Sequence, residues 1–200
     1  MLARAVAILD VVERTPMGSS ELARQLGLSV PTAHRLAASM VKLGLLHKDA
    51  EGRHHLGPRF ASSALSAVAG PVLDELRRDT GETAQLWVRR GGDRLCLASI
   101  ESTEELRASV PVGTLLPLAD GGSAAEVLTA SPESRRPWVE SVGRRTPGLC
   151  SVSAGVHLGG DVVAALCLSA PIFRVGEDGP GARYGQLVVS AAQRLENAVR

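Results

Sequence analysis

The first part of the chain spaces its apolar positions with the period of a helix. The pattern predicts three helices, over residues 1–13, from Ser19 or Ser20 to Leu26, and over residues 30–43. Gly27 can adopt the left-handed conformation that ends the second helix, and Ser29 is a suitable N-cap for the third. Two short helices joined by a glycine turn, the second with a polar outer face, are typical of a helix-turn-helix.

Two short alternating segments follow, residues 45–48 and 53–56, separated by a turn that ends in Gly52. This spacing predicts a β-hairpin, so that the N-terminal region forms a winged helix. Alternation with Leu56 directs His54 inward and leaves Arg53 and His55 on the outer face of the wing.

The next stretch is rich in alanine and predicts a linker helix over residues 59–70, with Pro71 beginning another helix that ends near Gly81. The expected domains are therefore a winged helix over residues 1–58, the linker, and a second domain over residues 71–200.

Beyond Gly81 the period changes to two, which predicts strands. The Gly91-Gly92-Asp93 and Gly159-Gly160-Asp161 turns each lie between two such segments, and Ser123 begins a helix between the two hairpins. The expected elements are strands over residues 83–89, 94–100, 106–110, 151–158 and 162–169, and a closing helix over residues 182–199. The predicted fold class is α+β, with a sensor-like antiparallel sheet in the second domain.

Composition narrows the classes of protein. Hydrophobic residues make up 44% of the chain, as in a globular protein, and the three cysteines form no CxxC pair. A disulfide framework or a structural zinc site is not expected, and a reducing cytoplasm suits the chain. The longest apolar run, residues 162–168, has the length of a strand, and no charged-then-apolar leader begins the sequence, so we expect no membrane association.

Charge is uneven along the chain. Residues 1–60 hold eight basic and five acidic groups, whereas the remainder holds fourteen basic and sixteen acidic groups. A basic N-terminal region on a nearly neutral body suits a nucleic-acid contact that is confined to that region.

The order of motifs resembles the IclR family of bacterial transcription regulators over nearly the whole chain. The similarity rests on segments 4–9, 21–36 and 52–58 in the first domain and on segments 80–86, 110–113 and 162–171 in the second. It implies a winged-helix DNA-binding domain, a GAF-like domain that binds a small metabolite, and a dimer or a dimer of dimers. Within the family the chain is most similar to regulators of amino-acid metabolism in high-GC bacteria.

The chain departs from the family pattern in three ways. It is short near residues 61–70 and 131–140, either through deletion or because residues are missing from the sequence. Ser141-Val142-Gly143-Arg144-Arg145-Thr146 stands where the family has an acidic cluster, and Ala154-Gly155-Val156 replaces its Ala-Pro-Val.

The third helix and the wing supply the candidate DNA contacts. Arginine can donate two hydrogen bonds to guanine, so Arg35 is the first candidate for reading a base and His34 the second. Short hydroxyls fit phosphate contacts that fix the register, and wing residues can reach the backbone or the minor groove. The full predicted set is Ser20, Ser29, Thr32, His34, Arg35, Ser39, Arg53 and His55. The alternative is a solvated face of an ordinary three-helix bundle with an exposed hairpin.

The resemblance also implies an effector pocket at the loop before the central helix and on the last strands. Amides at a helix N-terminus attract an anion, and short hydroxyls bind one without bulk. The family positions fall on Gly122, Ser123, Ala124, Ser141, Ser151, Cys167 and Ser169. The alternative is that these serines and the cysteine bond locally to the backbone.

No catalytic, cofactor or metal motif is present: the sequence lacks GxSxG, a P-loop, a dinucleotide fingerprint and paired histidine ligands. We therefore expect a homodimeric, non-enzymatic regulator, most simply a repressor, that binds an operator in double-stranded DNA and responds to an amino acid or a 2-oxo acid. The alternative is a sensor or assembly module whose helix-turn-helix has become a protein-binding surface.

Overall fold

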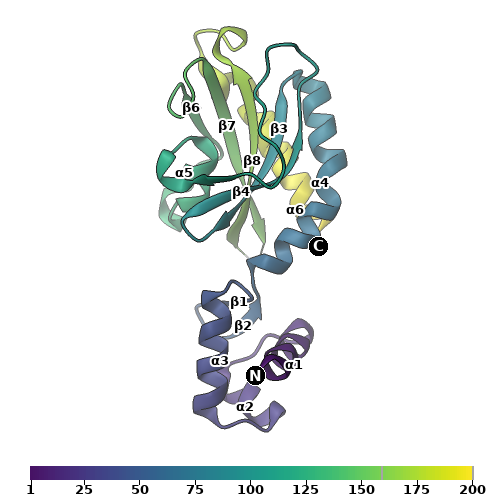
Figure 1. Ribbon diagram of the computed structural model, residues 1–200, viewed down its shortest axis with the longest axis vertical. Helices are drawn as coiled ribbons and strands as arrows, with labels where there is room; N and C mark the ends of the chain where they lie inside the picture. Colours follow the sequence, from purple (N-terminus) through teal and green to yellow (C-terminus); the bar gives the residue numbers. More distant parts are fainter. Residues whose placement is uncertain (159, 200) are drawn as a thin grey trace. The chain divides into compact units, whose positions relative to one another are not determined.

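Three helices and a hairpin form the N-terminal unit, Met1–Ser63, of the computed structural model, which describes residues 1–158 and 160–199 (Figure 1). The elements are α1 (Leu2–Arg14), α2 (Ser19–Leu26), α3 (Val30–Lys42), β1 (Leu46–Lys48) and β2 (His54–Leu56). Ile8 of α1, Leu22 of α2 and Ala33 of α3 are fully buried together in one core cluster. Gly27 has a φ of +63°, so the glycine turn between α2 and α3 is confirmed.

The serine cap predicted for α2 is wrong. The helix is capped by Gly18, whose N–H donates to the Glu21 carboxylate at 3.2 Å. The Ser19 hydroxyl is instead bonded to Nε2 of His54 at 3.1 Å, and Ser20 is exposed. His54 itself is 3% exposed, as the alternation of the wing predicts.

Helix α4 (Pro58–Thr80) is continuous, so the predicted helix start at Pro71 is wrong. Leu65, Leu73 and Leu76 lie on one buried stripe that passes Pro71, while Pro71 itself is exposed. An internal proline costs about 3 kcal/mol, and burial of this stripe offsets that cost. The chain divides into its two units between Ser63 and Ala64, inside this helix, and not at residue 70.

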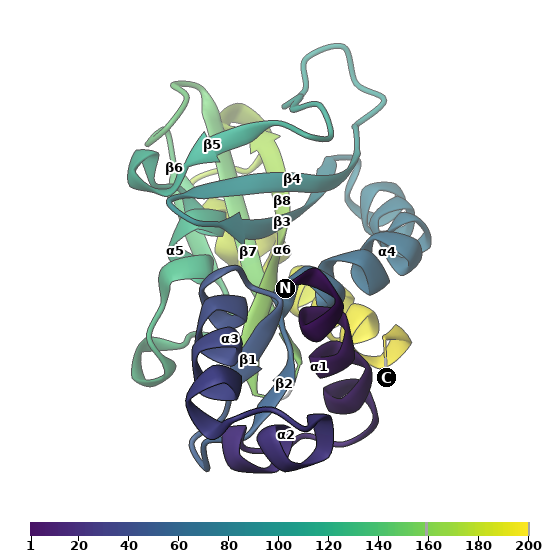
Figure 2. The same cartoon turned by 60° about the horizontal axis from the view of Figure 1, so that its bottom comes forward.

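The second unit, Ala64–Arg200, contains a six-stranded sheet in the order β5-β4-β3-β8-β7-β6, and all neighbouring strands are antiparallel. The strands are β3 (Thr83–Arg90), β4 (Asp93–Ile100), β5 (Leu115–Pro117), β6 (Val139–Val142), β7 (Leu149–Leu158) and β8 (Asp161–Pro171). Figure 2 shows β5, β4 and β3 side by side. Both predicted hairpins are confirmed, although Gly159 in the second turn lies outside the described residues.

Helices cover both faces of this sheet. On one face α4 and α6 (Gly179–Ala198) pack against apolar residues such as Leu86 and Leu166. On the other face α5 (Ser123–Thr129) packs with Trp87 and Cys167, the sequence neighbours of those leucines. This alternation follows from the period of two along β3 and β8. The predicted α+β architecture is confirmed.

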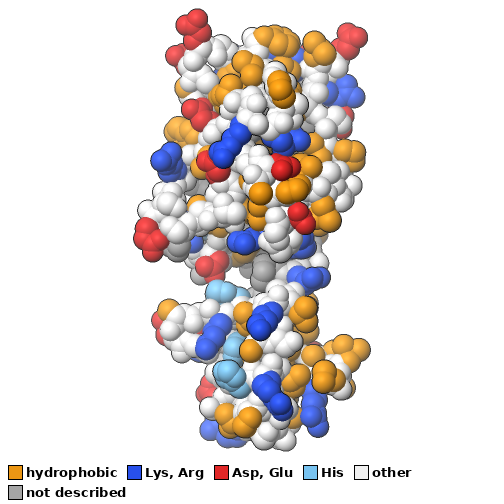
Figure 3. Space-filling view, turned by 60° about the vertical axis from the view of Figure 1, so that its left-hand side comes forward, with side chains coloured by type: hydrophobic (Ala, Val, Ile, Leu, Met, Phe, Trp, Pro, Cys, Tyr) orange, Lys and Arg blue, Asp and Glu red, His pale blue; other side chains and the backbone are white. Residues whose placement is uncertain are grey.

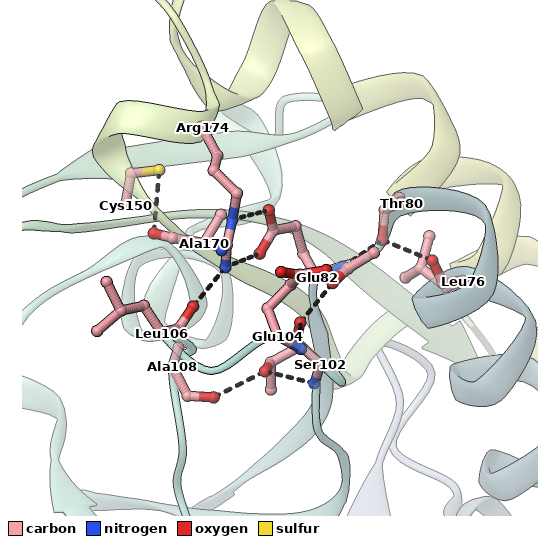
Figure 4. A network of polar contacts seen from close by, with 12 residues as sticks. Leu76, Thr80, Glu82, Ser102, Glu104, Leu106, Ala108, Cys150, Ala170 and Arg174 are labelled. Carbon is pink, nitrogen blue, oxygen red and sulfur yellow. Dashed lines mark hydrogen bonds and ion pairs between the residues drawn. The ribbon is translucent and has the colours of Figure 1, made fainter.

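The strand predicted over residues 106–110 is wrong, and β5 and β6 were not predicted. Residues 101–114 form an irregular loop whose carbonyls bond to distant side chains (Figure 4). The Thr83 hydroxyl donates to the Ala108 carbonyl at 2.7 Å, and Arg174 donates to the Leu106 carbonyl at 2.6 Å. These side chains satisfy the loop carbonyls without a neighbouring strand.

A partly buried ion pair joins Glu82, the residue before β3, to the short helix η3 (Ile172–Arg174). Arg174 donates from Nε to Oε1 of Glu82 at 2.7 Å and from Nη2 to Oε2 at 3.0 Å, and the Glu82 side chain is only 3% exposed. The same guanidinium holds the Leu106 carbonyl. Glu82 therefore fixes the arginine that ties the loop to the sheet.

Replacing Glu82 tests how much its ion pair with Arg174 contributes to stability. We expect Glu82→Gln to lower the free energy of unfolding by about 3 kcal/mol, because it leaves the Arg174 charge without its partner. Urea denaturation of the whole chain measures the change. Arg78→Gln is the control, since the Arg78–Asp74 pair is exposed and should change stability by less than about 1 kcal/mol. Equal effects of the two variants would contradict the assignment.

Low pH should lower the stability of the N-terminal unit, because the buried His54 resists protonation. Burial lowers the pKa of His54 below its usual value near 6.5, and Lys48 and His34 lower it further. The unfolded chain then binds a proton at a higher pH than the folded chain, so stability is complete above about pH 7 and falls as the pH drops through 6.5. Hydrogen exchange of α1–α3 amides between pH 7 and 5 measures this loss. His54→Phe should reduce the pH dependence and His34→Gln should keep it; the opposite order would refute this explanation.

Candidate functional sites

The outer face of α3 is polar and exposed. His34, Arg35 and Ser39 are exposed, whereas Ala33 and Met40 on the inner face are buried. Figure 3 shows lysine, arginine and histidine side chains on a face of this unit. Within the described residues, Arg35 makes no ion pair, so its guanidinium is available to an external acceptor.

The serine and threonine candidates lie at the N-terminal ends of α2 and α3. Ser29 is the N-cap residue of α3, but its hydroxyl bonds to the Thr32 hydroxyl at 2.8 Å and makes no side-chain cap. Ser20 is exposed on the first turn of α2. Both helix starts therefore present hydroxyls to solvent.

In the wing, Arg53 and His55 converge on Asp49. Its carboxylate accepts hydrogen bonds from the Arg53 backbone N–H at 2.7 Å, from the Arg53 Nε at 3.0 Å and from the His55 Nε2 at 2.8 Å. The hydrogen bond from His55, followed by those from Arg53, holds the pKa of Asp49 well below its usual range. The wing residues therefore carry a partly compensated charge, in contrast with Arg35.

The second unit contains a pocket on the α5 face of the sheet, and all seven predicted effector residues line it. About 60 Å³ of its space is accessible to the centre of a water molecule, which suits a small ligand. Sequence reasoning missed the other lining residues: Gln85, Trp87, Arg94, Ala108, Ser109, Val110, Arg144, Arg145, Thr146, Leu149 and Cys150.

Hydroxyl groups from α5 and β7 bond to one another at the wall of this pocket. The Ser123 hydroxyl lies 2.7 Å from that of Ser151 and 2.8 Å from that of Ser153, and Ser123 is 1% exposed. On β8, the Cys167 sulfur is 3.5 Å from the Ser169 hydroxyl. In the described part of the chain these side chains thus bond to one another and not to local backbone.

Arg94 is the pocket residue with the most unusual surroundings. It is 4% exposed, its Nε has no hydrogen-bond partner, and its guanidinium lies 5.2 Å from the centre of the Trp87 ring. Burial lowers the pKa of this guanidinium. Gly122, whose φ of +92° favours glycine, packs beside it, and a Cβ there would make ordinary contact with both terminal nitrogens at 3.7 Å.

The period of two in β4 places Arg94 on the same face as the buried Cys96, so the pattern could have identified an inward arginine. No group of three histidine, cysteine, aspartate or glutamate side chains that could hold a metal ion occurs within residues 1–158 and 160–199. In the same part of the chain, every helix is too short or too polar to cross a membrane.

Comparison with known proteins matches both units of the chain to one family. The IclR helix-turn-helix domain matches residues 1–50, and the C-terminal domain of the bacterial transcriptional regulator IclR matches residues 60–139. A crystal structure of an IclR-family regulator from Rhodococcus sp. superposes with a TM-score of 0.62 at 26% identity, covering 98% of this chain and 92% of that one.

Two characterised relatives differ from this chain in length. The HTH-type transcriptional regulator KipR of Bacillus subtilis is 29% identical over 161 aligned positions, which cover 76% of this chain and 63% of KipR. The transcriptional repressor IclR of Escherichia coli is 24% identical over 241 aligned positions, covering 97% of this chain and 88% of the repressor. Because the alignment is longer than this 200-residue chain, the chain lacks residues that this repressor has, and their location near residues 61–70 and 131–140 stays a prediction. The winged helix, the sheet domain and these matches together show that the chain belongs to the IclR family of bacterial transcriptional regulators.

Proposed function

We propose that this regulator is a cytoplasmic repressor that binds its operator as a homodimer and changes its DNA affinity when a small metabolite occupies the pocket of the second unit. The observation that carries the proposal is the presence, in one chain, of an exposed helix face with an unpaired arginine and a small pocket with buried polar groups. The exposed helix face suits a contact with DNA, and the pocket suits a small ligand.

The DNA contact is assigned to α3 and the wing. Arg35 donates to a guanine edge in the major groove, His34 supports it, and the hydroxyls of α2 and α3 fix the register on phosphates. Arg53 and His55 reach the backbone from the wing. Two copies would place their recognition helices one turn of DNA apart on a palindromic site.

The ligand is assigned to the pocket, with an amino acid or a 2-oxo acid as the general class. Such a ligand changes the DNA affinity only if it binds one conformation of the protein better than another. A coupling free energy of about 1–3 kcal/mol is typical and corresponds to a change of about fivefold to 150-fold.

Arg35→Ala tests the DNA contact. We expect the variant to lose about tenfold to a hundredfold in affinity for DNA from the region upstream of the gene, because one bidentate base contact is worth about 1–3 kcal/mol. A mobility-shift titration measures the loss. Arg78→Ala, an exposed arginine on α4, is the matched control and should bind as the unaltered chain does. No specific shift, or equal affinities, would favour a protein-binding role for the helix-turn-helix.

Ser123→Ala tests the pocket. A thermal-shift screen of amino acids and 2-oxo acids identifies a binder, whose affinity calorimetry then measures. We expect Ser123→Ala to weaken it by about fivefold or more, because the hydroxyls of Ser151 and Ser153 lose their shared partner. Ser169→Ala should also weaken it. Ser190→Ala on α6 is the control, since that hydroxyl bonds only to its own helix. Unchanged affinity in both pocket variants would place the ligand elsewhere.

A further inference from the structure

Positive charge gathers in the pocket without a matching acid. Three arginines line it, Arg94 from β4 and Arg144 and Arg145 from the segment after β6, and none of the described lining residues is an aspartate or a glutamate. Arg144 donates to the Glu126 carboxylate at 2.5 Å and is thereby paired. Arg94 and Arg145 make no hydrogen bond or ion pair with other side chains in the described part of the chain.

The buried member, Arg94, requires a counter-charge. An arginine stays protonated in proteins, and a buried cation without a partner is costly. Burial lowers the pKa of Arg94, and repulsion from Arg145 lowers it further, so the two cations are close enough to oppose each other. Cys167 and then Asp120 raise the pKa of Arg94 in turn, but Cys167 is a thiol and Asp120 is exposed and does not line the pocket. The side chain is therefore poised for an anion from outside the protein.

Neutral donors surround the same space. The Nε2 of Gln85 is buried without a hydrogen-bond partner, and Gln85 is only 2% exposed. The hydroxyls of Ser123 and Ser151, which bond to each other at 2.7 Å, line the same pocket and are able to reorient toward an acceptor. Two buried polar side chains of the same pocket, Arg94 and Gln85, thus lack partners that the oxygens of an acid would supply.

The two free arginines differ in depth. Arg94 is nearly inaccessible, whereas Arg145 is exposed and also lines the pocket. A ligand with a single acidic group can neutralise Arg94 and leaves Arg145 uncompensated. A zwitterionic amino acid would bring an ammonium group into a site that already holds two guanidinium groups.

We propose that the pocket takes a small organic dianion, such as a short dicarboxylate, with one acidic group on Arg94 and the other on Arg145. The inference rests on the proposed function in that it concerns the same pocket, and it narrows the ligand class from amino acids and 2-oxo acids in general. Ser141 and Ser151 line the same pocket and offer hydroxyls as neutral donors.

Matched pairs of acids test the proposal. Calorimetry of the whole chain at low salt compares succinate with butyrate, and 2-oxoglutarate with 2-oxopentanoate. Each pair keeps the chain length and removes one carboxylate. We expect the dianion to bind about fivefold more tightly than its partner, the contribution of one exposed ion pair, with a smaller difference at high salt. Inorganic phosphate, which has no second acidic group at the end of a carbon chain, should bind no better than butyrate.

Three variants separate the two arginines. In Arg145→Gln the two acids of each matched pair should bind with equal affinity, and the affinity for the monoanion should not fall. Arg94→Gln should weaken both members by about thirtyfold or more, because a buried partner is lost. Arg78→Gln, an exposed arginine of α4 outside the pocket, is the matched control and should keep the preference for the dianion. Circular dichroism confirms that each variant is folded.

Several outcomes would overturn the proposal: equal binding within the pairs, a preference that survives Arg145→Gln, binding of amino acids or neutral compounds only, or no binding of any acid. The effect of each compound on DNA affinity is measured separately, by mobility shift. If a neutral compound binds and alters DNA affinity, the dianion proposal fails and the regulatory function stands. If dianions bind as expected without altering DNA affinity, the pocket assignment stands and the regulatory function fails.

Discussion

The two faces of the six-stranded sheet have opposite chemistry, and this division determines where the chain can hold a ligand. Along β3, β7 and β8, every second side chain is apolar and packs against α4 and α6. The intervening side chains face α5 and include the polar or small Gln85, Ser151 and Cys167 beside the large Trp87. Strand geometry alone imposes this separation, because successive residues point to opposite faces. The apolar face stabilises the unit, and the other face is free to vary in its binding chemistry.

The Glu82–Arg174 pair completes the pocket from outside the sheet. Arg174 holds the Leu106 carbonyl, and Thr83 holds that of Ala108, whose neighbours Ser109 and Val110 line the pocket. An irregular loop normally costs conformational entropy to order, and here buried side chains of β3 and η3 supply the hydrogen bonds that offset it. The same interaction therefore supports the fold and one wall of the site.

The local parts of this architecture could be predicted from sequence. The Gly27 turn, the wing and both long hairpins depend on neighbours within a few residues, and periodicity captures them. The irregular loop over residues 101–114 could not be predicted, since Arg174, which donates to the Leu106 carbonyl, lies 68 residues away in the sequence. The break at Pro71 was predicted from local preference and is overridden by the buried stripe of α4. The family resemblance located the serines of the pocket, whereas the isolation of Arg94 is a property of the folded surroundings and has no counterpart in the sequence pattern.

The alternation along β3 also bears on how a ligand could influence the rest of the chain. Gln85 and Trp87 line the pocket, and Leu86 between them belongs to the core cluster that includes Leu73 of α4. Helix α4 begins in the N-terminal unit and continues into the second. A ligand that fixes the side chains of β3 on one face acts on the same strand that supports α4 on the other. Close packing resists continuous deformation, so such an effect requires two discrete arrangements of this core, and the ligand must favour one of them.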